Sequence, residues 1–195
     1  MSLAEVVAVA RHEAPVQLSA DARAAMAHSA ALVDGFVAGD HPVYGVTTGF
    51  GSLATTVIPP ERTAELQVAL VRSHAAGMGP QVEREVVRGL LFLRARSLAM
   101  GFSGARPELV DLQLALLNSG LSPVVREHGS LGASGDLAPL AHCALALIGE
   151  GEVWTADDRR LPAASALSEA GLTPVTLRAK EGLALINGTQ IIQAI

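Results

Sequence analysis

The stretch GSLGASGDLAPLAH, from Gly129 to His142, joins a turn of small residues to the start of an apolar run. Directly before the acid Asp136 stand three of the smallest residues, Ala133, Ser134 and Gly135. The run over residues 137–148 is apolar on every side except at His142, which predicts a helix buried on all faces. The simplest explanation of the polar residues is that Asp136 or Ser134 caps this helix.

A second explanation of the same residues is chemical. The amide nitrogen of Gly135 can attack the carbonyl carbon of Ala133 if the chain bends tightly, because both residues offer little steric hindrance. Loss of one water from the closed ring, and of the Ser134 hydroxyl as a second water, leaves 4-methylideneimidazole-5-one. This electrophile needs no added cofactor. Asp136 is suited to move protons during the dehydrations, and the positive N-terminal end of the following helix favours negative charge on the ring.

The composition predicts a mainly helical protein. Hydrophobic residues make up 50% of the 195 residues but aromatic residues only 3%, so the core must be built from alanine, leucine and valine. Such a core favours closely packed helices over a β-sandwich. We expect a single unit over residues 1–195, in which loops and a short β-hairpin connect the helices.

Charge and cysteine content exclude several classes of protein. The net charge is −5 and the 14 basic residues are spread along the chain, without the basic stripe that binds nucleic acid. No apolar run reaches the roughly 18 residues that span a membrane, and the N-terminus does not resemble a signal peptide. The single cysteine, Cys143, cannot close an intrachain disulfide, and no histidines have metal-site spacing. We expect a cytoplasmic protein without nucleic-acid, membrane or metal partners.

Apolar periodicity predicts where the helices lie. Ser19 is expected to cap a helix from Ala20 to Phe36, and Pro107 to open one that ends at Gly120. Further helices are expected over residues 61–77, 82–100, 137–148 and 163–170. In the helix over 82–100, Arg88 is expected to point outward. Residues 41–60 predict a long loop and residues 149–162 a surface hairpin.

Four stretches resemble the aromatic amino acid ammonia-lyases, in the order in which that family carries them. Besides GSLGASGDLAPLAH, they are YGVTTGFG from Tyr44, SHAAGMG from Ser73 and GLALINGTQ from Gly182. The resemblance covers the whole chain but only the N-terminal part of a family member. It implies the helical fold of the ammonia-lyase and fumarase-aspartase type, a homotetramer in the full-length protein, and the methylidene-imidazolone electrophile. It also implies further catalytic residues after Ile195, so residues 1–195 alone are expected to be inactive.

The resemblance extends to the substrate. Ser73 and His74 stand where the histidine-specific enzymes of the family carry this pair, whereas phenylalanine enzymes tend to have Phe-Leu and tyrosine enzymes His-Leu. This implies nonoxidative elimination of ammonia from L-histidine to give trans-urocanate. A phenylalanine or tyrosine ammonia-lyase, or an aminomutase with the same electrophile, is one alternative. A catalytically silent structural fragment is an alternative of another class.

Roles for single residues follow from the same resemblance. Tyr44 matches the essential tyrosine of the family, which acts as a base or only positions the substrate. His74, with Ser73 beside it, is expected to bind the substrate, because His74 matches the residue that holds the substrate imidazole. Asn187 matches the neutral donor beside the electrophile. By itself, His74 on an apolar helix stripe is more typical of a core histidine. His142 is assigned to the core.

Overall fold

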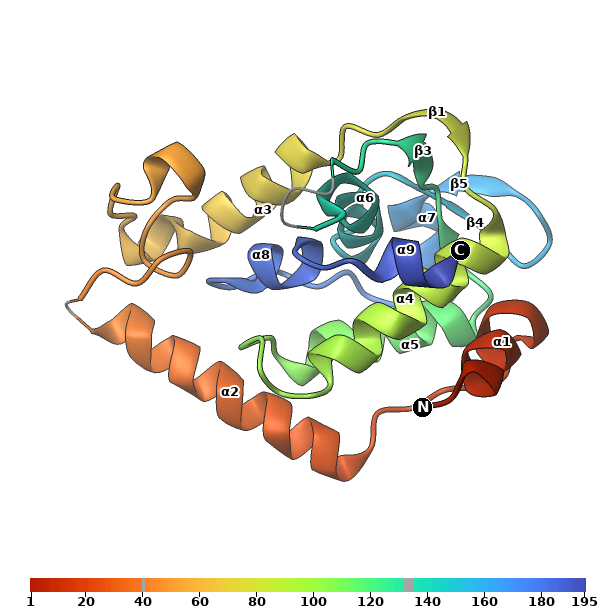
Figure 1. Cartoon of the computed structure of the whole chain (residues 1–195), viewed down its shortest axis with the longest axis horizontal. Helices are drawn as coiled ribbons and strands as arrows, with labels where there is room; N and C mark the ends of the chain where they lie inside the picture. Colours follow the sequence, from red (N-terminus) through yellow and green to blue (C-terminus); the bar gives the residue numbers. More distant parts are fainter. Residues whose placement is uncertain (40, 132–134) are drawn as a thin grey trace.

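The protein is described by a computed structural model that covers residues 1–39, 41–131 and 135–195. Within these ranges the chain is mainly helical, as its composition predicts (Figure 1). Its α-helices are α1 (Leu3–His12), α2 (Ala20–Ala38), α3 (Thr63–His74), α4 (Arg84–Leu98), α5 (Pro107–Asn118), α6 (Leu137–Leu147), α7 (Ala163–Glu169), α8 (Glu181–Ile186) and α9 (Gln190–Ala194).

The strands are short and pair antiparallel in two small sheets. They are β1 (Met78–Gln81), β2 (Ser122–Pro123), β3 (Arg126–His128), β4 (Glu152–Trp154) and β5 (Arg160–Pro162). β1 pairs with β3, and β4 lies between β2 and β5. The β4–β5 hairpin confirms the prediction for residues 149–162. The β1–β3 pair was not predicted, because its hydrogen bonds join segments that are distant in the sequence.

Most helices begin and end close to their predicted bounds. The Ser19 hydroxyl accepts a hydrogen bond from the Ala22 amide at 3.2 Å and caps α2. Pro107 is the first residue of α5, where its missing N–H costs nothing. Residues 41–60 contain turns, a 3₁₀ turn at Gly51–Leu53 and an isolated bridge, but no α-helix, which confirms the long loop.

Helix α1 is absent from the predicted elements although its signal is in the sequence. The Ser2 hydroxyl accepts a hydrogen bond from the Glu5 amide, and the Glu5 carboxylate accepts one from the Ser2 amide. This reciprocal capping box satisfies two N–H groups that a helix start leaves unpaired. α1 then packs against α4.

The prediction that Arg88 points outward was wrong. Arg88 is only 2% exposed, and its guanidinium donates to the carbonyl oxygen of Val9 in α1 at 3.0 Å and of Leu117 in α5 at 3.1 Å. Because α1 covers this face of α4, the side chain is enclosed. Carbonyl groups near two helix ends satisfy its donors.

Helix α6 lies inside the molecule and packs against α3, α5, α7 and α8 (Figure 1). Its buried residues occur on all sides, as its sequence predicts; they are Ala138, Pro139, Leu140, Ala141, Cys143, Ala144, Ala146 and Leu147. The segment that follows the Ala-Ser-Gly tripeptide is therefore held by the core of the protein.

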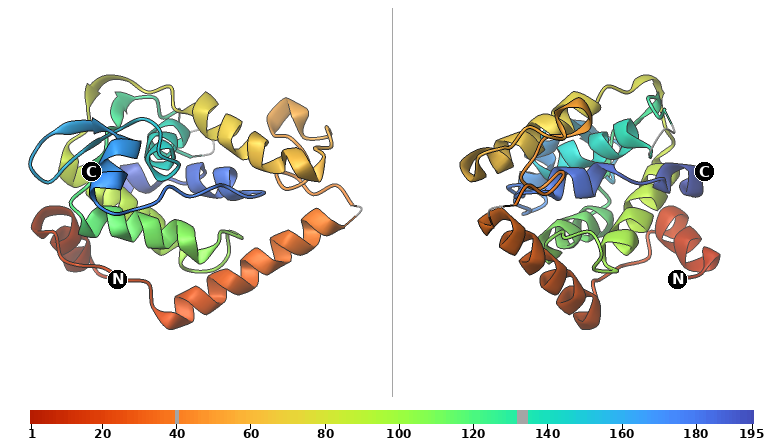
Figure 2. Two further views of the ribbon diagram at one scale, coloured as in Figure 1. Left: turned by 180° about the vertical axis from the view of Figure 1, so that it is seen from behind. Right: turned by 60° about the vertical axis from the view of Figure 1, so that its left-hand side comes forward.

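Helix α2 forms an outer edge of the molecule in every view (Figures 1 and 2). Its buried residues are Met26, Ala30 and Val33, whereas Leu32 and Phe36 are exposed. It leads into the loop over residues 41–60, which is therefore attached to the edge of the molecule. In the described ranges, no helix has the length and apolar character needed to cross a membrane.

Candidate active site

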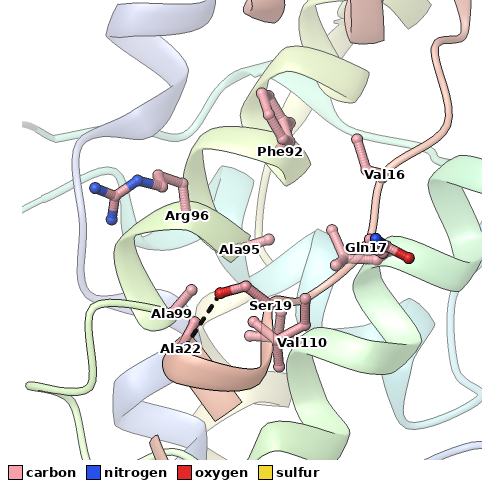
Figure 3. A pocket seen from close by; sticks show the side chains of 11 residues that line it. Val16, Gln17, Ser19, Ala22, Phe92, Ala95, Arg96, Ala99 and Val110 are labelled. Atoms are coloured by element: carbon pink, nitrogen blue, oxygen red, sulfur yellow. Dashed lines mark hydrogen bonds between the residues drawn. The ribbon is translucent and has the colours of Figure 1, made fainter. Parts of the chain in front are cut away.

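A cavity of about 510 Å³ between α4, α5 and the segment before α2 contains none of the predicted site residues (Figure 3). Its lining side chains are mostly apolar, with Arg96 as the charged one. The hydroxyl of Ser19, which also lines it, is occupied in capping α2. We therefore do not assign the chemistry to this cavity.

Gly135 and Asp136 are the part of the tripeptide region that the structure describes, since Ala133 and Ser134 lie outside the described residues. Gly135 has φ 140°. A Cβ at this position would lie 2.7 Å from the carbonyl oxygen of Gly188, 3.0 Å from its nitrogen and 3.1 Å from Oδ1 of Asn187. The Asp136 amide donates to the same Gly188 oxygen at 2.6 Å. Only glycine fits at position 135, and the predicted residue Asn187 lies directly beside it.

Asp136 precedes α6 but does not cap it with its side chain, so the capping prediction for Asp136 was wrong. The carboxylate is fully buried, and its Oδ1 accepts a hydrogen bond from the Ser130 hydroxyl at 2.6 Å. Among the described residues, its Oδ2 has no hydrogen-bond partner. A buried acceptor without a partner is costly and calls for a functional reason. An oxygen in this state is available to accept a proton from the neighbouring tripeptide.

His74 and Ser73, at the end of α3, line a cavity of about 280 Å³ together with Gly135. His74 Nδ1 lies 2.9 Å from the carbonyl oxygen of Leu70, which can only accept, so this nitrogen carries the proton. In the neutral imidazole, Nε2 is then left as a hydrogen-bond acceptor. Ser73 donates to the same carbonyl at 2.9 Å. His74 is half-buried at a cavity wall and is not a core histidine.

Tyr44 lies in the loop over residues 41–60 and is not among the residues that line the cavity of His74. Its side chain is 57% exposed, its ring packs edge-on against Phe50, and its hydroxyl accepts a hydrogen bond from the Gly51 amide at 3.4 Å. The neighbouring Gly45 approaches α8, because a Cβ there would lie 2.8 Å from Cδ2 of Leu183. The loop thus contacts α8, directly before Asn187, but no described contact brings Tyr44 itself to Gly135.

Asn187 directly follows α8 and is exposed. The neighbouring Gln190 does not offer a free oxygen, because its Oε1 accepts a hydrogen bond from Arg94 at 3.3 Å. Across the residues that the structure covers, no group of three or more His, Cys, Asp or Glu side chains is arranged to hold a metal ion. The site thus consists of the Gly135–Asp136 segment, the turn after α8 and the end of α3.

Comparison with known proteins identifies the family. A family profile described as aromatic amino acid lyase matches residues 1–195. The chain belongs to this family. Its relatives include the histidine ammonia-lyase of Streptomyces griseus, 57% identical over 185 residues, or 95% of this chain and 36% of that protein. The probable histidine ammonia-lyase of Halobacterium salinarum is 55% identical over 188 residues, or 96% of this chain and 36% of that protein.

Solved structures of the family have the same fold. The histidine ammonia-lyase of Trypanosoma cruzi superposes with a TM-score of 0.91 at 41% identity over 100% of this chain and 38% of that one. The ergothionase of Treponema denticola reaches 0.96 at 30% identity over 100% of this chain and 39% of that one. The chain therefore spans little more than a third of the length of the relatives that it matches.

His142 was predicted to lie in the core, but it is half-buried, as His74 is, and its ring forms a hydrogen bond within the fold. His142 Nε2 accepts a hydrogen bond from the Gly77 amide at 3.1 Å. Burial and, secondarily, the charge of Arg126 lower the pKa of His142, so the neutral ring that can accept this bond is favoured. His142 thereby ties the end of the SHAAGMG stretch to α6 and helps to place His74 at the cavity.

Two polar residues of the candidate site were missed by sequence reasoning. Ser130 binds the Asp136 carboxylate, and its position inside the quoted stretch is the only signal for this contact. Arg94 donates to Ala184 in α8 and to Gln190 in α9, which flank the turn after α8. The helical spacing does indicate that Arg94 is buried, because it lies three or four residues from Leu90, Leu91 and Leu98, on the buried stripe of α4.

Proposed function

We propose that the whole protein eliminates ammonia from L-histidine to give trans-urocanate, as a histidine ammonia-lyase. The observation that carries the proposal is that Gly135 lines one cavity with His74 and also lies beside Asn187, three residues from separate segments. Relatives at 52–57% identity that are named histidine ammonia-lyases support it. Ser73 and His74, the pair typical of histidine enzymes, argue against a phenylalanine or tyrosine enzyme and against an aminomutase.

The described residues fit the formation of 4-methylideneimidazole-5-one from Ala133, Ser134 and Gly135. The place beside Gly188 has no room for a Cβ on Gly135, and the buried Oδ2 of Asp136, which has no partner among the described residues, is available for protons. Ring closure joins the Gly135 nitrogen to the Ala133 carbonyl carbon and releases two waters, one of them carrying the Ser134 hydroxyl oxygen. When formed, this group supplies an electrophile that binds the substrate amine and makes it a better leaving group.

His74 is proposed to hold the imidazole of the substrate. Its Nδ1 is committed to the Leu70 carbonyl, so Nε2 faces a substrate ring as an acceptor and binds a ring N–H. A hydrogen bond of this kind selects histidine over phenylalanine, which has no donor to offer and would leave Nε2 unpaired.

Asn187 and Tyr44 are proposed to act on the rest of the substrate. The Asn187 side chain, whose Oδ1 lies beside Gly135, also carries a neutral NH2 donor that is suited to a substrate carboxylate or to the ring oxygen of the electrophile. Tyr44 is proposed either to accept a proton from the substrate or to position it. A phenol is a weak base at neutral pH, so proton abstraction requires surroundings that favour the phenolate.

We further propose that the whole protein is a cytoplasmic homotetramer whose remaining catalytic groups come from outside residues 1–195. On this proposal, residues 1–195 alone are inactive. The exposed position of Tyr44 supports it, since this side chain has further contacts to make before it meets a substrate.

The test is an activity assay of the whole protein with L-histidine, L-phenylalanine and L-tyrosine. The expected result is formation of urocanate, followed by its ultraviolet absorbance, together with an intact mass that is two waters below the encoded mass. Turnover of phenylalanine or tyrosine without urocanate would overturn the choice of substrate. An encoded mass without water loss would overturn the proposed electrophile.

A further inference from the structure

Arg94 reaches from α4 to the turn that joins α8 to α9. Its side chain is buried, with 4% exposed. Nη2 donates to the carbonyl oxygen of Ala184 in α8, and Nη1 donates to Oε1 of Gln190, the first residue of α9, at 3.3 Å. The guanidinium therefore holds both sides of the Asn187–Thr189 turn.

The charge of Arg94 is not used in an ion pair with any described residue. Burial lowers the pKa of Arg94 to about 10, so the group stays charged at neutral pH in surroundings that disfavour charge. Lys180 lies close enough that the charge of Arg94 contributes, after burial, to lowering the pKa of Lys180. Arg106, by contrast, binds the buried Glu181 carboxylate at 2.7 Å. Arg94 thus keeps a costly charge and directs its donors at the turn.

The contact between Arg94 and the turn leaves no free space. A Cβ on Gly188 would overlap both Nη1 of Arg94 and Oε1 of Gln190. Gly188 also contacts the electrophile segment, where its oxygen accepts the Asp136 amide at 2.6 Å and its nitrogen borders Gly135. Arg94 and the electrophile segment therefore both border the same glycine.

We propose that Arg94 is a positioning residue for ring formation, which holds Gly188 where it fixes the Asp136 amide and the backbone of Gly135. This inference rests on the proposed function, because it assumes that the Ala133-Ser134-Gly135 ring forms. Arg94 touches neither the ring atoms nor the substrate. It acts through the turn, and its removal allows Gly188 to move away from Asp136.

The test compares three arginines of α4 in the whole protein. Arg94→Met removes the donors at the turn. Arg88→Met removes an equally buried guanidinium, whose partners Val9 and Leu117 are not part of the site. Arg96→Met changes an exposed arginine of the same helix. Each variant is measured for the rate of water loss by intact mass, for the near-ultraviolet absorbance of the ring, for thermal stability, and for hydrogen exchange at the Asp136 amide.

Arg94→Met is expected to slow water loss by about tenfold or more and to speed exchange at the Asp136 amide to a similar degree, the effect of losing a buried charged hydrogen bond. Arg88→Met is expected to lower the melting temperature without changing either readout in the folded protein, and Arg96→Met to change none of them. Arg94→Lys, which keeps a charged donor, is expected to restore part of the rate.

Two results would overturn the inference. One is an Arg94→Met protein that loses water and protects the Asp136 amide as the parent does. The other is an Arg88→Met protein in which water loss slows and exchange at the Asp136 amide speeds up as much as in Arg94→Met. The effect would then be one of general stability. If the parent itself never loses water, the proposed function fails. Exchange at Asp136 would still report whether Arg94 holds the turn.

Discussion

The stretches YGVTTGFG and SHAAGMG are both rich in glycine, but the fold holds them differently. SHAAGMG is tied to distant elements, since the Gly77 amide donates to His142 of α6 and the following β1 pairs with β3. YGVTTGFG is held mainly by its own turns, such as the hydrogen bond from the Gly45 amide to the Thr48 hydroxyl at 3.2 Å.

The outcome for the two functional side chains differs accordingly. His74 lies at the wall of a cavity that Gly135 also lines, whereas Tyr44 remains 57% exposed. Hydrogen bonds between distant segments thus fix a side chain relative to the site, while bonds within a turn fix only the shape of the turn. The region around His74 is tied to distant elements within these residues, whereas Tyr44 is exposed.

The largest effect is expected at Gly135, beside which both His74 and Tyr44 are proposed to act. Gly135→Ala would force a Cβ against the backbone of Gly188 at 2.7 Å and impose a side chain at φ 140°. We expect no ring absorbance, no water loss in the intact mass, and activity at background. A protein with Gly135→Ala that forms the ring would contradict the close approach. Gly171→Ala is the matched control, because a Cβ at this glycine with positive φ meets nothing within 4 Å.

Tyr44→Phe tests the YGVTTGFG stretch, in which Tyr44 is exposed. The hydroxyl accepts only a long hydrogen bond, at 3.4 Å from the Gly51 amide, so stability should not change. Loss of a group that transfers a proton should lower kcat of the whole protein by about 10²-fold or more. Steady-state kinetics with L-histidine measures it. A kcat equal to that of the parent would remove Tyr44 from the chemistry.

His74→Ala tests the SHAAGMG stretch, which hydrogen bonds tie to distant elements. Removal of the imidazole acceptor should raise KM for L-histidine about tenfold, as expected for one hydrogen bond between a side chain and a substrate. His41→Ala, a change at an exposed histidine of the long loop, should leave KM unaltered. Equal effects of both substitutions would mean that His74 does not bind the substrate.

A pair of glycine substitutions compares the packing of the two stretches. Gly77→Ala would place a Cβ 2.8 Å from Nε2 of His142 and 3.1 Å from Cβ of Arg126, and should lower the free energy of unfolding by about 2 kcal/mol. Gly51→Ala meets nothing within 4 Å and bears only the strain of its positive φ, about 1 kcal/mol. Urea denaturation measures both. A larger loss in Gly51→Ala would reverse the comparison.

The smallest expected effect is a pH dependence at His142. Its pKa in the folded protein lies below the ordinary value of 6.5, because of burial first and Arg126 second. The stability that the neutral ring contributes is therefore fully present above pH 6.5 and is lost as the pH falls through the lower folded-state pKa. His142→Gln should flatten the stability profile below pH 6.5, measured by denaturation at a series of pH values. An unchanged slope would exclude His142 as its source.

Much of the helical framework could be predicted from local patterns. The Ser19 cap, Pro107 at the start of α5 and the fully apolar α6 are set by residues within one or two turns of each other. The candidate site was predictable as a set of residue types, because Ala-Ser-Gly, His74 and Asn187 lie in stretches that resemble one family. Which of these residues lie next to one another in the fold could not be predicted from the stretches.

What the sequence by itself determined is the helical class, the family and the small residues that ring closure requires. Only the tertiary structure decided that Gly135 lies against Gly188, that Asp136 binds Ser130 and leaves one oxygen without a described partner, and that Arg88 and Arg94 are enclosed. The physical reason is the distance along the chain over which each interaction acts. Caps and apolar periods act between neighbours in the chain, whereas the burial of a guanidinium or the approach of two backbones depends on which distant helix covers that face.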